Sequence, residues 1–197
     1  YLVERFEDYW GEAAKLDQID FRFLPDPTTR LLALEAGEVD LIYDVPRDAA
    51  PGLQDGGAFD LAVSGVGAYQ ALAVNIHGDA PYELGQDPII REAVAMAIDK
   101  QIIADAAWQG FAIVDNGMIP AAVLGEAEAD ITRVPYDPAA ASQLLEDAGW
   151  MAGGDGIREK DGRRLQLELI SGYPTAEIQG TAPELIQAQL REIGVEL

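Results

Sequence analysis

Three Asp-Pro dipeptides, at residues 26–27, 87–88 and 137–138, are the feature that most constrains the fold of this chain. An aspartate before a helix accepts hydrogen bonds from the free N–H groups of the first turn, and proline at the first helical position already has a helical φ. Apolar residues at helical spacing follow each dipeptide. Three helices are therefore expected to begin at these points, with strands and loops between them.

The N-terminal part of the chain alternates strand and helix patterns. Residues 19–26 alternate apolar and polar side chains, which predicts a strand, and the helix that follows is expected to end at Gly37. Residues 39–45 predict a short buried strand. These segments together predict a strand-helix-strand unit with parallel strands. Residues 59–65 and 69–76 predict two further strands, joined by a glycine-rich turn.

Helix patterns dominate the C-terminal part. Residues 87–110, DPIIREAVAMAIDKQIIADAAWQG, predict one long amphipathic helix that packs on a core through apolar residues spaced three and four apart. Residues 136–150 predict another capped helix, and residues 156–170 predict a hairpin with an Asp-Gly turn. Residues 174–194 predict a last helix, with a possible kink at its proline.

A polar segment at residues 77–88 carries Pro and Gly and predicts a linker between two parts of the chain. The lone histidine, His77, lies in it and is expected to be an exposed residue. The sequence starts at Tyr1 without a methionine, and the apolar residues Val195 and Leu197 at its other end are typical of a strand being entered. We therefore expect the chain to be a piece of a longer protein.

The charge balance excludes one class of partner. The chain has 13 Lys and Arg against 35 Asp and Glu, a formal net charge of −22. Such a surface repels nucleic acid and anionic lipid, so no nucleic-acid partner is expected. The acidic residues are spread along the chain, which favours a hydrated surface suited to a salt-rich habitat over a site for a cationic ligand. No apolar run reaches the length of a membrane span, so the chain is expected not to cross a membrane.

Motifs of catalysis are missing from the sequence. Without cysteine the chain has no disulfide, thiolate metal site or cysteine nucleophile. The segment GVGAYQ lacks the third glycine of a dinucleotide fingerprint, and GEAEAD lacks the spaced ligands of a calcium loop. Carboxylates are so frequent that a pair of them identifies no glycosidase site. We therefore predict no catalytic residue, no metal site and no cofactor.

The order of several sequence segments resembles the order found in a known protein family. EDYWGEAAKLDQIDFRFLPDPTTRLLALEAGEVDLIYDVP is followed by ALAVNI, by DPIIREAVAMAIDKQIIADAAWQG, by MIPAAVLG, by PYDPAAASQLLEDAGW, by the GIREKDG hairpin and by IQAQLREIGVEL. This order resembles the family 5 extracellular solute-binding proteins of ABC importers, the peptide- and nickel-binding group, over nearly all of the chain. Val74 departs from the aromatic-Asn pair that is common in the family, whereas Asn75 matches it.

The resemblance implies an α/β fold with mixed sheets flanked by helices, part of a two-lobed periplasmic-binding-protein-like (type II-like) fold with the ligand between the lobes. Residues 1–76 would be the late part of one lobe, residues 77–88 the crossover, and residues 89–197 the larger part of the other lobe, truncated at its end. Loops at strand ends are where α/β sheets place ligands. The expected ligand-binding residues are therefore the following: Tyr69, Asn75, Ser171 and Tyr173. For Asn75 the alternative is a structural side chain that bonds the linker backbone, and for Tyr173 it is an exposed turn aromatic.

The function that the resemblance implies is that of a non-enzymatic receptor. It would bind a small peptide-like solute and deliver it to the membrane permease of an ABC importer, in the periplasm or at the cell surface. An oligosaccharide or a nickel chelate is the alternative solute. Two other classes stay open on the residues alone: an acidic module that binds a basic protein, and a hydrolase that uses two carboxylates.

Overall fold

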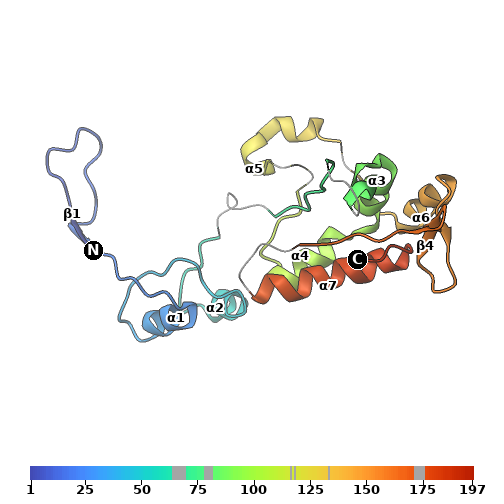
Figure 1. Ribbon diagram of the computed structural model, residues 1–197. Coiled ribbons are helices and arrows are strands. Elements are labelled where there is room, and N and C mark those ends of the chain that lie inside the picture. Colours follow the sequence, from blue (N-terminus) through green and yellow to red (C-terminus); the bar gives the residue numbers. More distant parts are fainter. Residues whose placement is uncertain (64–69, 78–81, 116, 118, 133, 171–175) are drawn as a thin grey trace. The chain divides into compact units, whose positions relative to one another are not determined.

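The structure, a computed structural model, describes residues 1–63, 70–77, 82–115, 117, 119–132, 134–170 and 176–197 (Figure 1). The chain forms two compact units, residues 1–61 and residues 62–197, and each is described by itself. The predicted assignment of residues to two lobes with a crossover at 77–88 stays a prediction.

Unit 1, residues 1–61, consists of a hairpin and two short helices. Strand β1 (Leu2–Glu4) pairs antiparallel with β2 (Gln18–Asp20). Helix α1 (Pro27–Glu35) begins where the first Asp-Pro dipeptide predicts, because the Asp26 carboxylate accepts a hydrogen bond from the Thr29 N–H at 2.7 Å. Helix α2 spans Ala50–Gly56.

The predicted strand-helix-strand unit is wrong. Residues 39–45 form no strand, and the strand at β2 pairs with β1 instead of with a parallel neighbour. Leu41 and Tyr43 are 81% and 88% exposed, so the apolar run that suggested a buried strand has no strand beside it in unit 1. The described parts of the next two predicted strands, residues 59–63 and 70–76, are likewise not assigned to a sheet.

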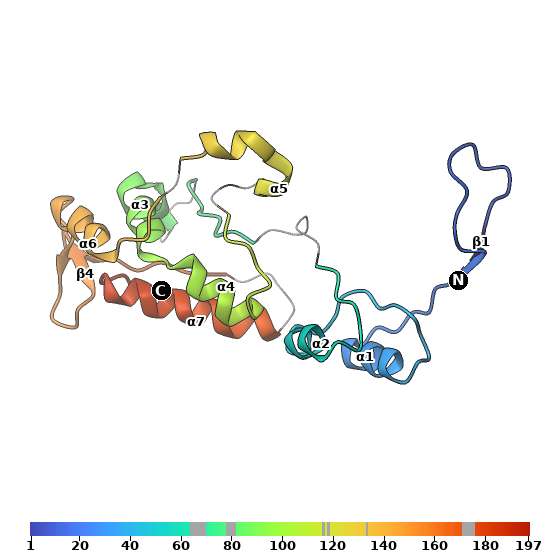
Figure 2. The same cartoon turned by 180° about the vertical axis from the view of Figure 1, so that it is seen from behind.

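Unit 2, residues 62–197, is built mainly from helices around one apolar core. Its longer helices in chain order are α3 (Pro88–Ala97), α4 (Lys100–Trp108), α6 (Pro138–Asp147) and α7 (Ala176–Glu192). Shorter helical segments are η1 (Tyr82–Gln86), α5 (Ala121–Leu124) and η2 (Gly125–Asp130). Figure 1 and the reverse view in Figure 2 both show α3 beside α6 and α4 running along α7.

The single long helix predicted for residues 87–110 is two helices. The backbone of Ile98 is extended, with ψ 112°, and this ends α3. Asp99 then caps α4 by accepting hydrogen bonds from the N–H groups of Gln101 and Ile102. The N–H group of Asp99 itself donates to Gln189 Oε1 of α7 at 2.9 Å. The break is thus stabilised by a residue 90 positions away in the chain, which helical periodicity does not reveal.

The hairpin prediction is confirmed. Strands β4 (Arg158–Lys160) and β5 (Arg163–Arg164) pair antiparallel, and β3 (Met151–Ala152) pairs with the other edge of β4. The turn residues Asp161 and Gly162 both have positive φ, 53° and 78°, as a tight hairpin turn requires. After the hairpin the chain runs on to Gln166, which forms a parallel bridge with Glu196. The strand start predicted at the C-terminal end is confirmed by this bridge.

The core of unit 2 lies between α3, α6, α7 and the small sheet. Its largest fully buried side chains are Ile90, Leu145, Ile157, Leu165, Leu190, Ile193 and Val195. At roughly 25 cal/mol per Å² of apolar surface removed from water, burial of such side chains is the main stabilising contribution. The structure combines helices and sheet strands, which confirms the α/β class. Within the described helices, none has both the length and the apolar character needed to cross a membrane.

Candidate functional site

Three of the four predicted ligand-binding residues, Tyr69, Ser171 and Tyr173, lie outside the described residues. The fourth, Asn75, is exposed, and its Oδ1 accepts a hydrogen bond from the N–H of His77 at 3.0 Å. This local bond holds the chain where it leaves the segment 72–75. A ligand-binding role for the four residues stays a prediction.

Asn75 lines an open groove of about 700 Å³ within unit 2. One wall is the extended segment 72–75, and the opposite wall is residues 166–169 after the hairpin. The base includes apolar side chains of α7, among them Ile186 and Leu190, which belong to the core and are 8% and 1% exposed. Polar side chains are present as well, from Gln166, Glu168, Glu184 and Gln187. An apolar surface with a few polar groups is typical of a binding groove.

A glycine sets the position of one wall. A Cβ atom on Gly85 of η1 would lie 2.6 Å from the backbone oxygen of Asn75 and 2.9 Å from Cγ1 of Val74. Both distances are shorter than van der Waals contact, so a side chain at residue 85 would displace the wall 72–75. Glycine therefore allows the segment to pack directly on η1.

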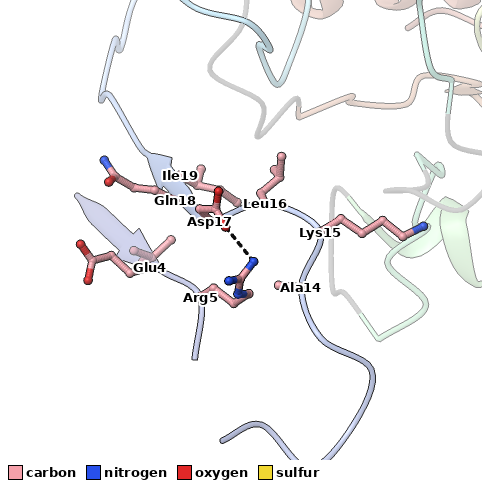
Figure 3. Close-up of a pocket in the computed structure, with 9 residues that line it drawn as sticks. Glu4, Arg5, Ala14, Lys15, Leu16, Asp17, Gln18 and Ile19 are labelled. Atoms are coloured by element: carbon pink, nitrogen blue, oxygen red, sulfur yellow. Dashed lines mark hydrogen bonds and ion pairs between the residues drawn. The ribbon is translucent and has the colours of Figure 1, made fainter. Parts of the chain in front are cut away.

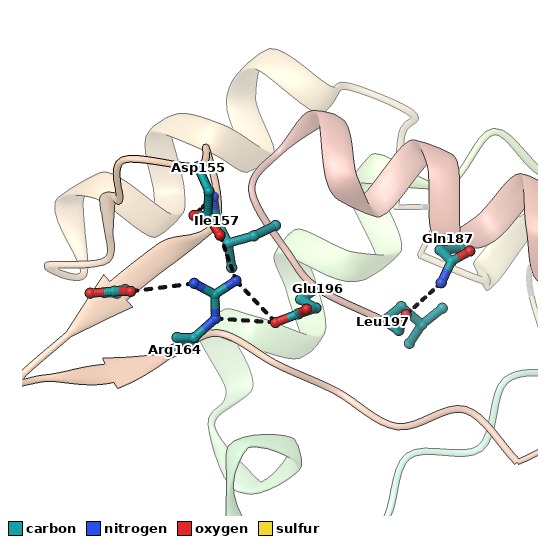
Figure 4. Close-up of polar contacts among 7 residues, drawn as sticks. Asp155, Ile157, Arg164, Gln187, Glu196 and Leu197 are labelled. Atoms are coloured by element: carbon teal, nitrogen blue, oxygen red, sulfur yellow. Dashed lines mark hydrogen bonds and ion pairs between the residues drawn. The ribbon is translucent and has the colours of Figure 1, made fainter.

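The other wall continues into an ion-pair cluster around Arg164 (Figure 4). The guanidinium donates to Asp155 Oδ2 at 2.8 Å and to Glu196 Oε2 at 3.2 Å, and it lies 3.5 Å from Glu159 Oε1. The hydrogen bond from Arg164, together with one from the backbone N–H of Ile157, lowers the pKa of Asp155 below its ordinary value. The hydrogen bonds to Asp155 and Glu196 raise the pKa of Arg164. The cluster joins β5 to the segment that carries Glu196, so it fixes the register of this wall.

A buried arginine, Arg158, connects the elements next to the wall formed by residues 166–169. Arg158 is 5% exposed, and its guanidinium donates to the backbone oxygens of Ile193 and Trp150 at 2.7 and 2.8 Å and to Glu146 Oε1 at 3.1 Å. The side chain thereby joins α6, the end of α7 and β4. Gly194 follows α7 with φ +81°, and a Cβ atom there would lie 2.7 Å from Cγ of Arg158. A positive φ and close contact both favour glycine at this position.

A second hollow, of about 450 Å³, lies in unit 1 under the β1–β2 hairpin (Figure 3). It is lined by residues 3–5 and 14–19. The Arg5 guanidinium beside it is bound to Asp17 at 2.7 Å and to Glu7 at 2.8 Å. Lys15 points away from Arg5 and Asp17. Because Arg5 and Asp17 of this hollow already pair with each other, the groove of unit 2 is the better candidate for a site.

Two carboxyl groups in the described part of the chain have shifted pKa values. The carboxyl pKa values that shift, those of Asp26 and Asp155, are both lowered. For Asp26 the main cause is the hydrogen bond from the Thr29 backbone N–H, which is the helix cap. A general acid needs a raised pKa instead. Nor do three His, Cys, Asp or Glu side chains of the described residues gather where a metal ion could bind.

Comparison with known proteins shows the family of this chain. The sequence profile of the bacterial extracellular solute-binding proteins, family 5 (middle), matches residues 1–197. The chain belongs to this family. It is 35% identical over 202 residues to the nickel-binding periplasmic protein of Escherichia coli K12, and 29% identical over 196 residues to the glutathione-binding protein GsiB of Salmonella typhimurium. Each alignment covers 98% of this chain, but 37% and 35% of the relative.

A solved structure confirms the fold. NikA from Brucella suis, crystallised with Fe(III)-EDTA, superposes with a TM-score of 0.76 at 32% identity, and the match covers 99% of this chain and 39% of NikA. The α/β fold expected from the resemblance is therefore that of a family 5 solute-binding protein. The chain spans a little over a third of the length of the curated relatives that it matches.

The groove itself was not foreseen from the sequence. The alternation of Leu165, Leu167 and Leu169 predicts a strand with one buried side, and these leucines do face the core or the groove. Nothing local indicates that the segment 72–75 lies across from them. The two walls are about ninety residues apart in the chain, and only tertiary packing brings them together.

Proposed function

We propose that residues 1–197 are part of an extracytoplasmic solute-binding receptor of an ABC importer, which binds a peptide-like solute and presents it to a membrane permease. The observation that carries the proposal is the family match over the whole chain. The glutathione-binding relative supports a peptide-like solute, since glutathione is a small peptide. The periplasmic relative supports an exported location. The role is binding, without catalysis.

A nickel chelate is the second candidate solute. It is supported by the nickel-binding relative, whose 35% identity exceeds the 29% of the glutathione-binding one. The two candidates differ in what a purified receptor would carry. A peptide is released as organic molecules only, whereas a chelate is released with an equivalent of metal.

The deciding experiment is mass spectrometry of the small molecules released when the intact protein, purified gently, is denatured, combined with elemental analysis of the same sample. Release of peptides without metal supports the proposal. Release of nickel with an organic chelator supports the second candidate. If the protein carries nothing and neither peptides nor nickel chelates raise its melting temperature, the receptor proposal is contradicted.

The proposal includes the four predicted contact residues Tyr69, Asn75, Ser171 and Tyr173. Replacing Tyr173 with Ala in the intact protein should weaken solute binding about tenfold or more, because an aromatic contact is lost, while the melting temperature stays unchanged. Ile113→Ala is the matched control, since Ile113 is 72% exposed. Equal affinities of the two variants would remove Tyr173 from the site. For Asn75, replacement with Asp keeps the acceptor for the His77 N–H, so a loss of binding there would indicate direct solute contact.

A further inference from the structure

The short helical segment η1 contacts both the core of unit 2 and the segment that carries Asn75. Leu84 of η1 is 6% exposed and belongs to the core. The next residue, Gly85, is buried and lies so close to Val74 and Asn75 that a Cβ atom would not fit between them. Val74 is 45% exposed, and Asn75 is exposed as well. The position of Asn75 is therefore tied to the position of η1.

One arginine holds the end of η1 on helix α3. Nη1 of Arg91 donates to the backbone oxygens of Gly85 and Gln86, at 2.8 Å each. Backbone oxygens at the end of a helical segment have no donor within the segment, so a side chain can supply one. The helix around Arg91 is fixed in the core, because Ile90 is 1% exposed and Ala93 is fully buried. Arg91 thus fastens the end of η1 to a rigid helix.

The start of η1 has a different connection, to the hairpin. Glu83 Oε1 lies 2.8 Å from a guanidinium nitrogen of Arg163 on β5, and the two side chains are 35% and 41% exposed. Ion pairs with this degree of exposure contribute little to stability. Arg91 instead binds the oxygen of Gly85 itself, which is the residue in contact with Asn75. Of these two connections, that of Arg91 is the one next to Asn75.

We propose that Arg91 is a positioning residue for solute binding. By holding η1 on α3, it fixes Asn75, through Gly85, where Asn75 contacts the solute. The inference rests on the proposed function, because it takes Asn75 as a contact residue. Arg91 acts on affinity through Asn75 alone, whereas an arginine that only stabilised the fold would act independently of Asn75.

Three variants of the intact protein separate the hydrogen bonds of Arg91 from its bulk. Arg91→Met keeps a long side chain but removes the donors. Arg91→Lys keeps a positive charge and three N–H donors on one nitrogen, so it can bond both oxygens and should restore the parent behaviour. Arg191→Met, at an exposed arginine of α7, is the matched control.

The first measurement needs no solute. Nuclear magnetic resonance relaxation of the backbone N–H of Asn75 reports how firmly the segment is held. We expect an order parameter of about 0.85 in the parent protein and below about 0.6 in Arg91→Met. Arg91→Lys and Arg191→Met should stay near the parent value. An Asn75 amide with the order parameter and chemical shift of the parent in folded Arg91→Met overturns the proposal.

The second measurement is the dissociation constant of the solute that the parent protein binds. Arg91→Met should weaken binding about tenfold in the parent background but by less than about twofold in an Asn75→Ala background, because the effect passes through Asn75. Arg91→Lys should restore most of the affinity. Weakening by the same factor in both backgrounds contradicts the proposal, since it shows that Arg91 acts independently of Asn75.

The two measurements also separate this proposal from the receptor function. If the parent protein binds a solute and Arg91→Met binds it equally well, the positioning role is overturned and the receptor function stands. If the parent protein binds no solute, the receptor function and any role of Arg91 in binding are both contradicted. The order parameter of Asn75 then still decides whether Arg91 fixes this segment.

Discussion

Unit 1 and unit 2 use the same local signals but differ in what holds them together. In unit 1 the described residues bury only two apolar side chains, those of Ala33 and Ala50. Many of its large apolar side chains are exposed, including Tyr1, Phe6, Trp10, Phe23, Leu41 and Tyr43. Unit 2 instead has a continuous core that includes Ile90, Leu145 and Leu190. Helix caps and hairpins thus form in both units, whereas a core forms only where several helices converge on a sheet.

Two arginines repeat this contrast. In unit 1, Arg30 donates to the backbone oxygens of Leu24, Pro25 and Asp44 at 2.9 to 3.0 Å and organises loops without an apolar core. In unit 2, Arg158 makes similar bonds but is enclosed by the core. Exposed apolar side chains in a small unit are typical of a surface that contacts other polypeptide. Unit 1 therefore buries less apolar surface within itself than unit 2 does.

The largest expected difference between the units comes from truncating a leucine. Leu145 is fully buried, so Leu145→Ala should lower the free energy of unfolding by about 3 kcal/mol, through lost burial and the cavity that remains. Leu41→Ala in unit 1 should change it by less than about 0.5 kcal/mol, because Leu41 is 81% exposed. Urea denaturation of both variants measures the difference. Equal losses would mean that unit 1 is as tightly packed as unit 2.

The next effect concerns the buried arginine. Arg158→Ala leaves the oxygens of Ile193 and Trp150 without donors, and we expect the free energy of unfolding to fall by about 2 kcal/mol. Arg158→Lys should recover little of it, because an ammonium group lacks the planar fork that reaches three acceptors. Arg164→Ala is the control, a partly exposed arginine whose loss should matter much less. Thermal unfolding that ranks the two arginines the other way would contradict this assignment.

A smaller effect is expected at the helix break. Asp99→Ala removes the acceptor for the N–H groups of Gln101 and Ile102, and should lower the free energy of unfolding by about 1 kcal/mol. Asp99→Asn keeps an acceptor and should cost less. Chemical denaturation of the two variants measures both changes. If alanine is neutral, the break between α3 and α4 does not depend on this cap.

The smallest expected effect is on the pH dependence of the free energy of unfolding. The pKa of Asp155 is lowered in the fold by Arg164 and the Ile157 N–H, whereas in the unfolded chain it is about 3.9. The ionised carboxylate therefore stabilises the fold fully above that pH, and its contribution is lost as the pH falls through the lower, folded pKa. Asp155→Asn should lose less stability than the parent protein between neutral pH and acid. Asp55→Asn, at an exposed carboxylate of unit 1, is the control and should show the same dependence of stability on pH as the parent protein. If Asp155→Asn also shows that dependence, the prediction is contradicted.

Much of the local structure could be predicted from the sequence. All three Asp-Pro dipeptides begin helices, and in each the aspartate accepts a hydrogen bond from the first turn, as at Asp137, which accepts from the Ala140 N–H. The Asp-Gly turn of the hairpin and the strand start at the C-terminal end were also predicted correctly. The family was predicted from the order of the phrases, and the profile match confirms it.

Other elements depend on residues far away in the chain, which a local sequence pattern does not reveal. Residues 39–45 have a strand sequence but no strand beside them, so the parallel unit predicted there does not form. The helix break at Ile98 and Asp99 is stabilised by Gln189 of α7, whose Oε1 accepts a hydrogen bond from the Asp99 N–H. Of the candidate site, the sequence indicated Asn75 and the leucine face after the hairpin, but not that they line one groove.

The sequence by itself determined where the three helices after Asp-Pro begin and where the hairpin turns, because a cap, a proline or a positive φ is decided within a few residues. It also determined the family, through the order of its phrases. Only the tertiary structure decided which extended segments find partners, where Arg158 is enclosed, and that residues 72–75 face residues 166–169. These features depend on hydrogen bonds and packing between residues far apart in the chain, whose energies no local pattern contains.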